Sequence, residues 1–90
     1  MVSSNWKTAM FIDGNKAQLA RDAASGQGET LDALAALLKV DAADKAAFVS
    51  LTKARHAEIF ASVESADSIA TRLKAALQSD ARLAKYAEAV

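Results

Sequence analysis

The tetrapeptide Gly26-Gln27-Gly28-Glu29 separates two runs of helical periodicity and decides where the chain turns. Gly26 follows directly after the first run, where a helix often ends in a residue of left-handed conformation. Gly28 frees the chain to turn again. Glu29 places a carboxylate in the first turn of the next helix, where unpaired amides favour it. The tetrapeptide therefore predicts a sharp corner between two helices.

The composition favours helix along the rest of the chain. Proline is absent, about a quarter of the residues are alanine, and β-branched and aromatic residues are sparse. The chain has 90 residues and no cysteine, which fits one domain and excludes disulfides and thiolate zinc sites. We therefore expect a single all-α domain over residues 1–90. Its core is expected to contain the large apolar side chains, namely Trp6, Met10, Phe11, Ile12, Leu31, Leu34, Leu37, Leu38, Phe48, Leu51, Ile59, Phe60, Ile69, Leu73, Leu77, Leu83 and Tyr86.

Apolar residues at three- and four-residue spacing predict a compact bundle of about five short helices. The first, third and fourth helices are expected at about residues 5–12, 29–39 and 42–62. The second is expected to begin after Asp13 or Asn15 and to run to about Ser25. The fifth begins after Ser65 or Asp67 and contains Ile69, Leu73, Ala76 and Leu77, and a short final helix follows the cap signal at Ser79-Asp80. Side chains that cap helices are expected before the second, fourth and fifth of them: Asp13 or Asn15, Asp41 or Asp44, and Ser65 or Asp67. The stretch at residues 62–65 is expected to be a polar break.

The charges of the chain argue against two classes of partner. Eleven basic and eleven acidic side chains cancel, so neither nucleic acid nor an anionic membrane surface is an expected partner. No apolar run reaches the roughly 20 residues that span a bilayer. Residues 1–6 lack the basic start and long apolar stretch of a signal peptide. Either the protein is cytoplasmic, or an export leader has been removed.

No set of residues points to catalysis. His56 is the only histidine, and no second histidine stands at a spacing typical of a metal site. His56 could serve as a general base, but its position on a half-apolar stripe beside Phe60 favours a packing role. The serines lie at expected helix ends, where capping explains them. We therefore expect a protein that is not an enzyme, with no cofactor and no metal.

Four residues are candidates for binding. Gln27 has no structural reason for its identity, since a turn between two glycines accepts almost any polar residue, and Glu29 lies beside it. Trp6 and Phe11 are large apolar groups on a short helix near the amino end. They either close the bundle as a lid, which is favoured, or form the exposed part of a contact with another molecule.

The pattern of Gly26-Gln27-Gly28-Glu29 followed by Leu31 and Leu34-Ala35 is moderately specific. Generic helical positions extend it: Phe11-Ile12, Asn15, Leu19-Ala20, Asp22-Ala23, Leu37, Phe48, Ile59-Phe60 and the segment from Asp80 to Tyr86. In this order the residues resemble the carboxyl-terminal half of a family of uncharacterised bacterial proteins that carry a signal peptide and are known only as a domain of unknown function.

The resemblance implies an exported protein, periplasmic or secreted, and implies no activity, cofactor or catalytic residue. The sequence departs from the family pattern in three ways. The amino-terminal part with cysteines is absent. Ile59-Phe60-Ala61-Ser62 stands where the family has Ile-Phe-Pro-Ser, so the proline stop is lost. His56 stands where an aromatic residue is expected, which favours its packing role.

Three functions follow as hypotheses. The leading one is a non-enzymatic interaction module that docks a protein partner or a second copy of itself. The second is binding of a small apolar ligand or lipid within the bundle, because alanine-rich helices with few large side chains can leave a cavity. The weakest is a hydrolase that uses His56.

Overall fold

The computed structural model describes residues 5–61 and 65–90 of the chain. Its elements are α1 (Asn5–Gly14), α2 (Lys16–Ser25), α3 (Glu29–Leu37), α4 (Ala42–Ala54), α5 (His56–Ile59), α6 (Ala66–Gln78) and the 3₁₀ helix η1 (Ala84–Ala89). No strand occurs within these described ranges. The expected all-α bundle of about five short helices is therefore confirmed.

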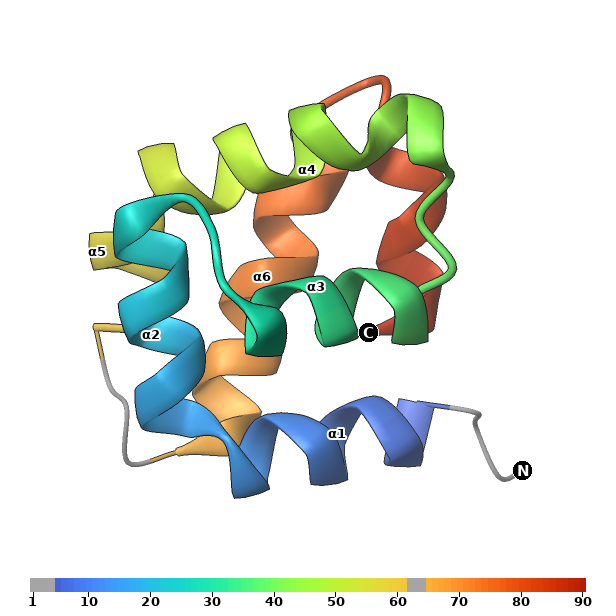
Figure 1. Ribbon diagram of the computed structural model, residues 1–90. Coiled ribbons are helices and arrows are strands. Elements are labelled where there is room, and N and C mark those ends of the chain that lie inside the picture. The colour runs from blue at the N-terminus through green and yellow to red at the C-terminus, as the bar shows by residue number, and fades with distance from the viewer. Residues whose placement is uncertain (1–4, 62–64) are drawn as a thin grey trace.

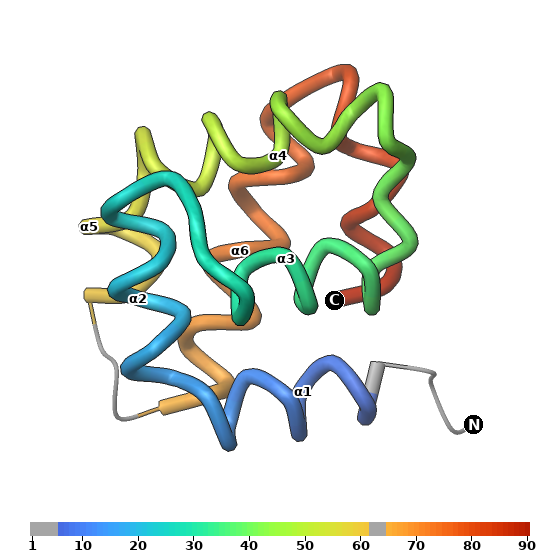
Figure 2. The backbone as a smooth tube through the Cα atoms, viewed as in Figure 1, coloured from blue at the N-terminus to red at the C-terminus, as the bar shows by residue number. Residues whose placement is uncertain are grey.

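Helix α6 runs through the middle of the molecule (Figure 1). It contacts α1, α4, α5 and η1, whereas α2 packs on α3, α4 and α5. The tube in Figure 2 shows α1 crossing one end of the molecule and α4 crossing the opposite end. No helix in the described ranges is long and apolar enough to cross a membrane.

The amphipathic pattern of α6 explains its central place. Its buried residues are Ile69, Leu73, Ala76 and Leu77, which recur at helical spacing and leave polar residues on the other face. Each large apolar side chain contributes about 1.5–3 kcal/mol when fully buried. Ser65 caps the helix, since its side chain accepts a hydrogen bond of 3.2 Å from the amide of Ser68. The predicted position and cap of this helix are confirmed.

The predicted long helix over residues 42–62 is wrong, because the chain breaks at Arg55. That residue has φ −114° and ψ 19°, and α5 starts afresh after it. The side chains of Ile59 and Phe60, which follow the break, are both buried in the core. The predicted polar break at residues 62–65 falls mostly outside the described residues.

The end of α3 differs from the prediction by two residues. The helix ends at Leu37, and the amide of Val40 bonds back to the carbonyl of Ala35 at 3.0 Å. This closing arrangement places Lys39 in the left-handed region, with φ 61°. Lys39 therefore lies beyond the last turn instead of within it, at a position where glycine is the usual residue.

The junction between α1 and α2 is closed differently from the prediction. Asn15 occupies the position before α2, but its side chain makes no capping hydrogen bond. Its Nδ2 donates instead to the carbonyl of Phe11 at 2.8 Å, which closes the end of α1. Asp13 lies within α1 and pairs with Lys16 at 3.0 Å. The prediction that Asp13 or Asn15 caps α2 is therefore wrong.

Most of the expected core residues are buried, three are half-buried and two are exposed. Trp6 and Met10 are 52% and 64% exposed, so the prediction that they belong to the core is wrong. Both face away from the bundle, whereas Ile12 on the same helix is fully buried. Phe11, Leu37 and Leu51 are half-buried. Phe11 and Leu51 pack on the edge of the core.

Candidate functional site

The corner at Gly26-Gln27-Gly28-Glu29 joins α2 to α3, as its sequence predicts. Gly26 is left-handed with φ 77°, and its amide bonds to the carbonyl of Asp22 at 2.8 Å. The amide of Gln27 bonds to the same carbonyl at 3.1 Å. Glu29 begins α3 and lies in its first turn. The predicted helix stop and helix start are both confirmed.

The carboxylate that caps α3 comes from the preceding helix. Oδ2 of Asp22 accepts the amides of Thr30 and Leu31 at 3.1 and 3.2 Å. Both amides are unpaired donors of a helix start, and an anion there is favoured. Because Asp22 lies eight and nine residues earlier in the chain, the spacing rule for local caps does not find it.

Gly28 is required for the carboxylate of Asp22 to reach α3. Its φ is 142°, a region that is open essentially to glycine alone. A Cβ atom on Gly28 would overlap the carboxyl group of Asp22. Two structural requirements, the positive φ and the close approach of Asp22, therefore explain why residue 28 is a glycine. Neither of them involves a ligand.

The two candidate binding residues at this corner, Gln27 and Glu29, are both exposed. Over the described part of the chain, neither side chain takes part in a hydrogen bond or ion pair with another residue. The corner thus presents two polar side chains to solvent without enclosing a pocket between them. They are available for binding, but their surroundings do not select a ligand.

The other two candidates lie on α1 and have different environments. Phe11 is half-buried and packs against the core, as a lid would. Trp6 is exposed over half of its surface, with the ammonium of Lys7 lying 5.8 Å from its ring centroid. Met10, one turn after Trp6, is also exposed. The structure therefore separates the pair: Phe11 closes the bundle, and Trp6 with Met10 forms an apolar surface.

His56 begins α5 and is half-buried. Its Nδ1 lies 2.8 Å from the carbonyl oxygen of Lys53, and since a carbonyl only accepts, Nδ1 carries the proton. This bond holds the ring against the end of α4. Within residues 5–61 and 65–90, no three His, Asp or Glu side chains gather where they could hold a metal ion.

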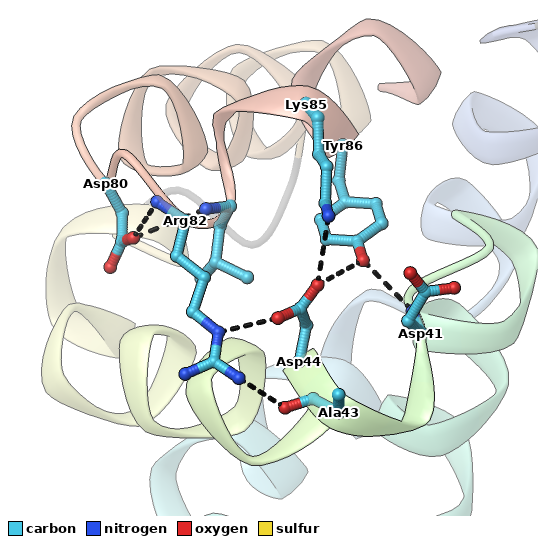
Figure 3. A network of polar contacts seen from close by, with 8 residues as sticks. Asp41, Ala43, Asp44, Asp80, Arg82, Lys85 and Tyr86 are labelled. Atoms are coloured by element: carbon cyan, nitrogen blue, oxygen red, sulfur yellow. Dashed lines mark hydrogen bonds and ion pairs between the residues drawn. The ribbon is translucent and has the colours of Figure 1, made fainter.

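The most concentrated polar group is the Asp44 cluster, formed by Asp44, Arg82, Lys85 and Tyr86 (Figure 3). Oδ1 of Asp44 accepts Nε of Arg82 at 2.6 Å. Oδ2 accepts the hydroxyl of Tyr86 at 2.6 Å and lies 3.3 Å from the ammonium of Lys85. One carboxylate thereby joins the start of α4 to the carboxyl-terminal segment.

The partners of this cluster extend to the backbone of α4. Nη2 of Arg82 also donates a hydrogen bond to the carbonyl oxygen of Ala43 at 2.6 Å. The hydroxyl oxygen of Tyr86 accepts a hydrogen bond from the amide of Asp41 at 3.1 Å. The prediction that Asp44 caps α4 is wrong, because its side chain makes these long-range contacts instead. Asp41 does precede the helix, but its side chain forms no capping bond either.

The donors around Asp44 keep it ionised. The hydroxyl of Tyr86, followed by the guanidinium of Arg82, lowers the pKa of Asp44 from 3.8 to about 2. Conversely, the hydrogen bond to Asp44 raises the pKa of Tyr86 above its ordinary value of 10.0. A carboxylate with both oxygens occupied and so low a pKa is unsuited to proton transfer near neutral pH. The Asp44 cluster is a structural clamp.

A cleft of about 280 Å³ opens between α1, the end of α3 and η1. Its lining residues are Lys7, Thr8, Leu37, Leu38, Lys39 and Ala89. Thr8 is buried, and its hydroxyl donates to the carbonyl of Ala89 at 2.8 Å. Sequence reasoning missed this cleft, because it joins residues more than eighty positions apart that share no periodic pattern.

Residues 1–87 match the model of a protein family described as "Protein of unknown function (DUF3015)", and the chain belongs to this family. No curated protein and no solved structure matches the chain. The expected membership of an uncharacterised family is therefore confirmed. The family description names no activity, substrate or location, so a function has to be argued from the residues of this chain.

Proposed function

We propose that this chain is a non-enzymatic helical interaction module that docks a protein partner, or a second copy of itself, through α1. The observation that carries the proposal is the exposure of Trp6 and Met10, which are 52% and 64% accessible on successive turns of one helix. Tryptophan and methionine are enriched at protein interfaces, and tryptophan often supplies a dominant anchor. Apart from Leu37, which is half-buried, the other large apolar residues of the described chain lie in the core or pack on it.

The surroundings of these two residues support docking by adding a recess beside them. Met10 lines an open groove of about 450 Å³ with Ala9, Asp13, Ser65, Ala66 and Asp67. The groove lies between α1 and the start of α6. Trp6 and Met10 alone are much smaller than the roughly 800 Å² that each partner buries in a standard interface. The partner is therefore expected to cover the groove as well.

The ionisable groups support a role without chemistry. Asp44 is clamped by three donors, and His56 uses Nδ1 to hold the end of α4. Neither residue lines the groove beside Met10 or the cleft between α1, α3 and η1. We propose a location in the bacterial cell envelope or outside the cell, on the strength of the resemblance to exported proteins; the cytoplasm is the alternative location.

The proposal is tested by removing the apolar surface without touching the core. Wild-type protein and the double variant Trp6→Ala/Met10→Ala are compared by sedimentation velocity and by pull-down from cell-envelope extract. The variant is expected to lose self-association or a specific retained protein while keeping its melting temperature. Val49→Ala, a half-buried change on α4, is the matched control and is expected to retain binding. A wild type that is strictly monomeric and retains no partner would refute the proposal.

The second candidate function is binding of a small apolar ligand. The cleft between α1, α3 and η1 favours it, because two leucines and an alanine line a recess of about 280 Å³. The site proposed for this ligand is therefore at the edge of the bundle, whereas the hypothesis drawn from the sequence is a cavity within it. Native mass spectrometry of the purified protein tests this function, and a ligand that co-purifies is the expected result.

A further inference from the structure

We propose that the cleft between α1, α3 and η1 binds a single-chain amphiphile with a carboxylate head, such as a free fatty acid. This inference rests on the second candidate function and names the chemistry of its ligand. The cleft has an apolar floor and a cationic rim, which together match a short hydrocarbon chain that ends in an anion.

The floor of the cleft offers little for a polar ligand. Leu37, Leu38 and Ala89 supply apolar surface. The one hydroxyl in the lining belongs to Thr8, which is 3% exposed and already donates to the carbonyl of Ala89 at 2.8 Å. Because that hydroxyl already donates, a carboxylate placed on the floor would lose its contacts with water and find no free hydroxyl donor there. A hydrocarbon chain has no such cost.

The rim carries two positive charges and no negative one. Lys7 and Lys39 line the cleft, and the other four lining residues are uncharged. Among the other five lysines of the described chain, Lys16, Lys45 and Lys85 pair with Asp13, Asp32 and Asp44, whereas Lys53 and Lys74 form no ion pair with a described residue and lie outside the cleft. Within the same described ranges no carboxylate lies within ion-pair distance of Lys7 or Lys39. An anionic head group would complement both ammonium groups at once.

The backbone at the rim provides a second, independent observation. Lys39 has φ 61°, and it is the one residue other than glycine with positive φ in the part of the chain that the structure describes. Glycine would occupy this position without strain, whereas a lysine there destabilises the fold. Strain of this kind is concentrated at functional sites. Binding of an anion by the Lys39 ammonium at the mouth of the cleft would explain why a strained lysine stands at this position.

The size of the cleft selects a single short chain. Its volume of about 280 Å³ is slightly below the roughly 300–1,000 Å³ of pockets that enclose drug-sized ligands. A phospholipid with two chains exceeds this space. The cleft instead fits a single hydrocarbon chain on its floor with the carboxylate at the rim, between Lys7 and Lys39. Figures 1 and 2 show how the backbones of α1, α3 and the carboxyl-terminal segment lie around it.

The test is a titration of the ¹⁵N-labelled protein with sodium decanoate, followed by NMR. The amide signals of Thr8, Lys39 and Ala89 are expected to shift and to saturate. Decanol and decyltrimethylammonium, which keep the chain and change the head group, are expected to bind more weakly. Equal binding of all three probes would overturn the inference and leave apolar binding intact. Failure of all three would overturn both.

Three variants test whether the two lysines at the rim of the cleft contribute to decanoate binding. Lys7→Ala and Lys39→Gly are each expected to weaken decanoate binding by roughly two- to fivefold, the range of an exposed ion pair. Lys39→Gly is also expected to raise the melting temperature by about 4–8 °C, since it removes the strain. Lys74→Ala, on α6 outside the cleft, is the charge-matched control, because Lys74 too forms no ion pair with a described residue. Unchanged affinity in both rim variants would overturn the inference.

A vesicle-binding experiment distinguishes a free fatty acid from a membrane lipid as the ligand. Phosphatidylglycerol vesicles present an anionic surface with two-chain lipids, and the protein is not expected to sediment with them. Sedimentation with vesicles in the absence of decanoate binding would overturn the inference. The Met10→Ala variant, which changes the docking surface and leaves the contact between Lys7 and Trp6 in place, is expected to bind decanoate normally, which distinguishes this cleft from the docking surface.

Discussion

Asp22 and Asp44 each join two segments with one carboxylate, but they do so over different distances along the chain. Asp22 accepts backbone amides eight and nine residues later, at the start of α3. Asp44 accepts side-chain donors from Arg82 and Tyr86, which lie 38 and 42 residues later. Asp22 therefore completes a local corner, whereas the Asp44 cluster fastens two distant parts of the fold.

The difference teaches which substitutions each region tolerates. Every residue except proline has a backbone amide, so the corner depends on Asp22 and on the absence of a side chain at Gly28, but not on which residues follow. The Asp44 cluster depends on the identity of Arg82, Tyr86 and Lys85, because their side chains are the donors. We therefore expect substitution of Gly28 to destabilise the corner most, and substitution of the donor or acceptor side chains to destabilise the Asp44 cluster most.

The largest effect is expected from Gly28→Ala. An alanine at φ 142° is strained, and its Cβ would overlap the carboxyl group of Asp22. We expect a loss of about 3 kcal/mol or more in the free energy of unfolding, measured by chemical denaturation. Asp22→Ala alone is expected to cost about 1–2 kcal/mol, as loss of a helix cap does. In the Asp22→Ala background the Gly28→Ala loss is expected to shrink, and an unchanged loss would show that overlap contributes nothing.

The next effect is expected from Asp44→Ala, which leaves the donors of Arg82 and Tyr86 without their acceptor. The melting temperature is expected to fall by roughly 8–12 °C in thermal unfolding followed by circular dichroism. Asp32→Ala is the matched control, because the one ion pair of this carboxylate within residues 5–61 and 65–90 is the exposed one with Lys45. A similar fall in both variants would mean that the Asp44 cluster contributes no more than a surface pair.

A smaller effect is expected on acidification. The pKa of Asp44 is about 2 in the folded protein, compared with 3.8 for an unperturbed carboxyl group. Because the folded pKa is the lower one, the cluster stabilises the fold fully above about pH 4 and loses this contribution as the pH falls toward 2. Melting temperatures measured over pH 2–5 are expected to drop more steeply for the wild type than for Asp44→Asn. Parallel curves would contradict this assignment.

The smallest effect is expected from Gln27→Ala. Its side chain is exposed at the corner, so the free energy of unfolding is expected to change by less than about 0.5 kcal/mol. If the corner takes part in partner docking, the same variant is expected to weaken the pull-down interaction. A stability loss as large as that of Gly28→Ala would show that Gln27 has a structural role.

The local features of this chain could be predicted from its sequence. The stop at Gly26, the start at Glu29 and the cap at Ser65 each depend on residues within a few positions of one another. The buried face of α6 follows from its periodicity. These are the features that neighbouring residues determine, and the structure confirms them.

The long-range features could not be predicted, because their signals are single residues. Asp41 and Asp44 look alike before α4, and only the positions of Arg82 and Tyr86 in space distinguish Asp44. Trp6 and Met10 resemble core residues, but α1 turns them away from the bundle. The cleft at Lys39 depends on a backbone angle and on the meeting of both ends of the chain. Periodicity carries none of this information.

The hydrogen bond from Thr8 to Ala89 has a consequence for folding during synthesis. It connects residues 81 positions apart, and α1 also contacts α6 and η1, which are made later than α1. Contacts between distant residues form slowly, because a long loop has to close first. During synthesis the inner face of α1 therefore stays partly uncovered until α6 and η1 have been made. A chain interrupted near Asp80 would lack η1, so Thr8 would lose its bond to Ala89 and α1 part of its cover, which favours aggregation.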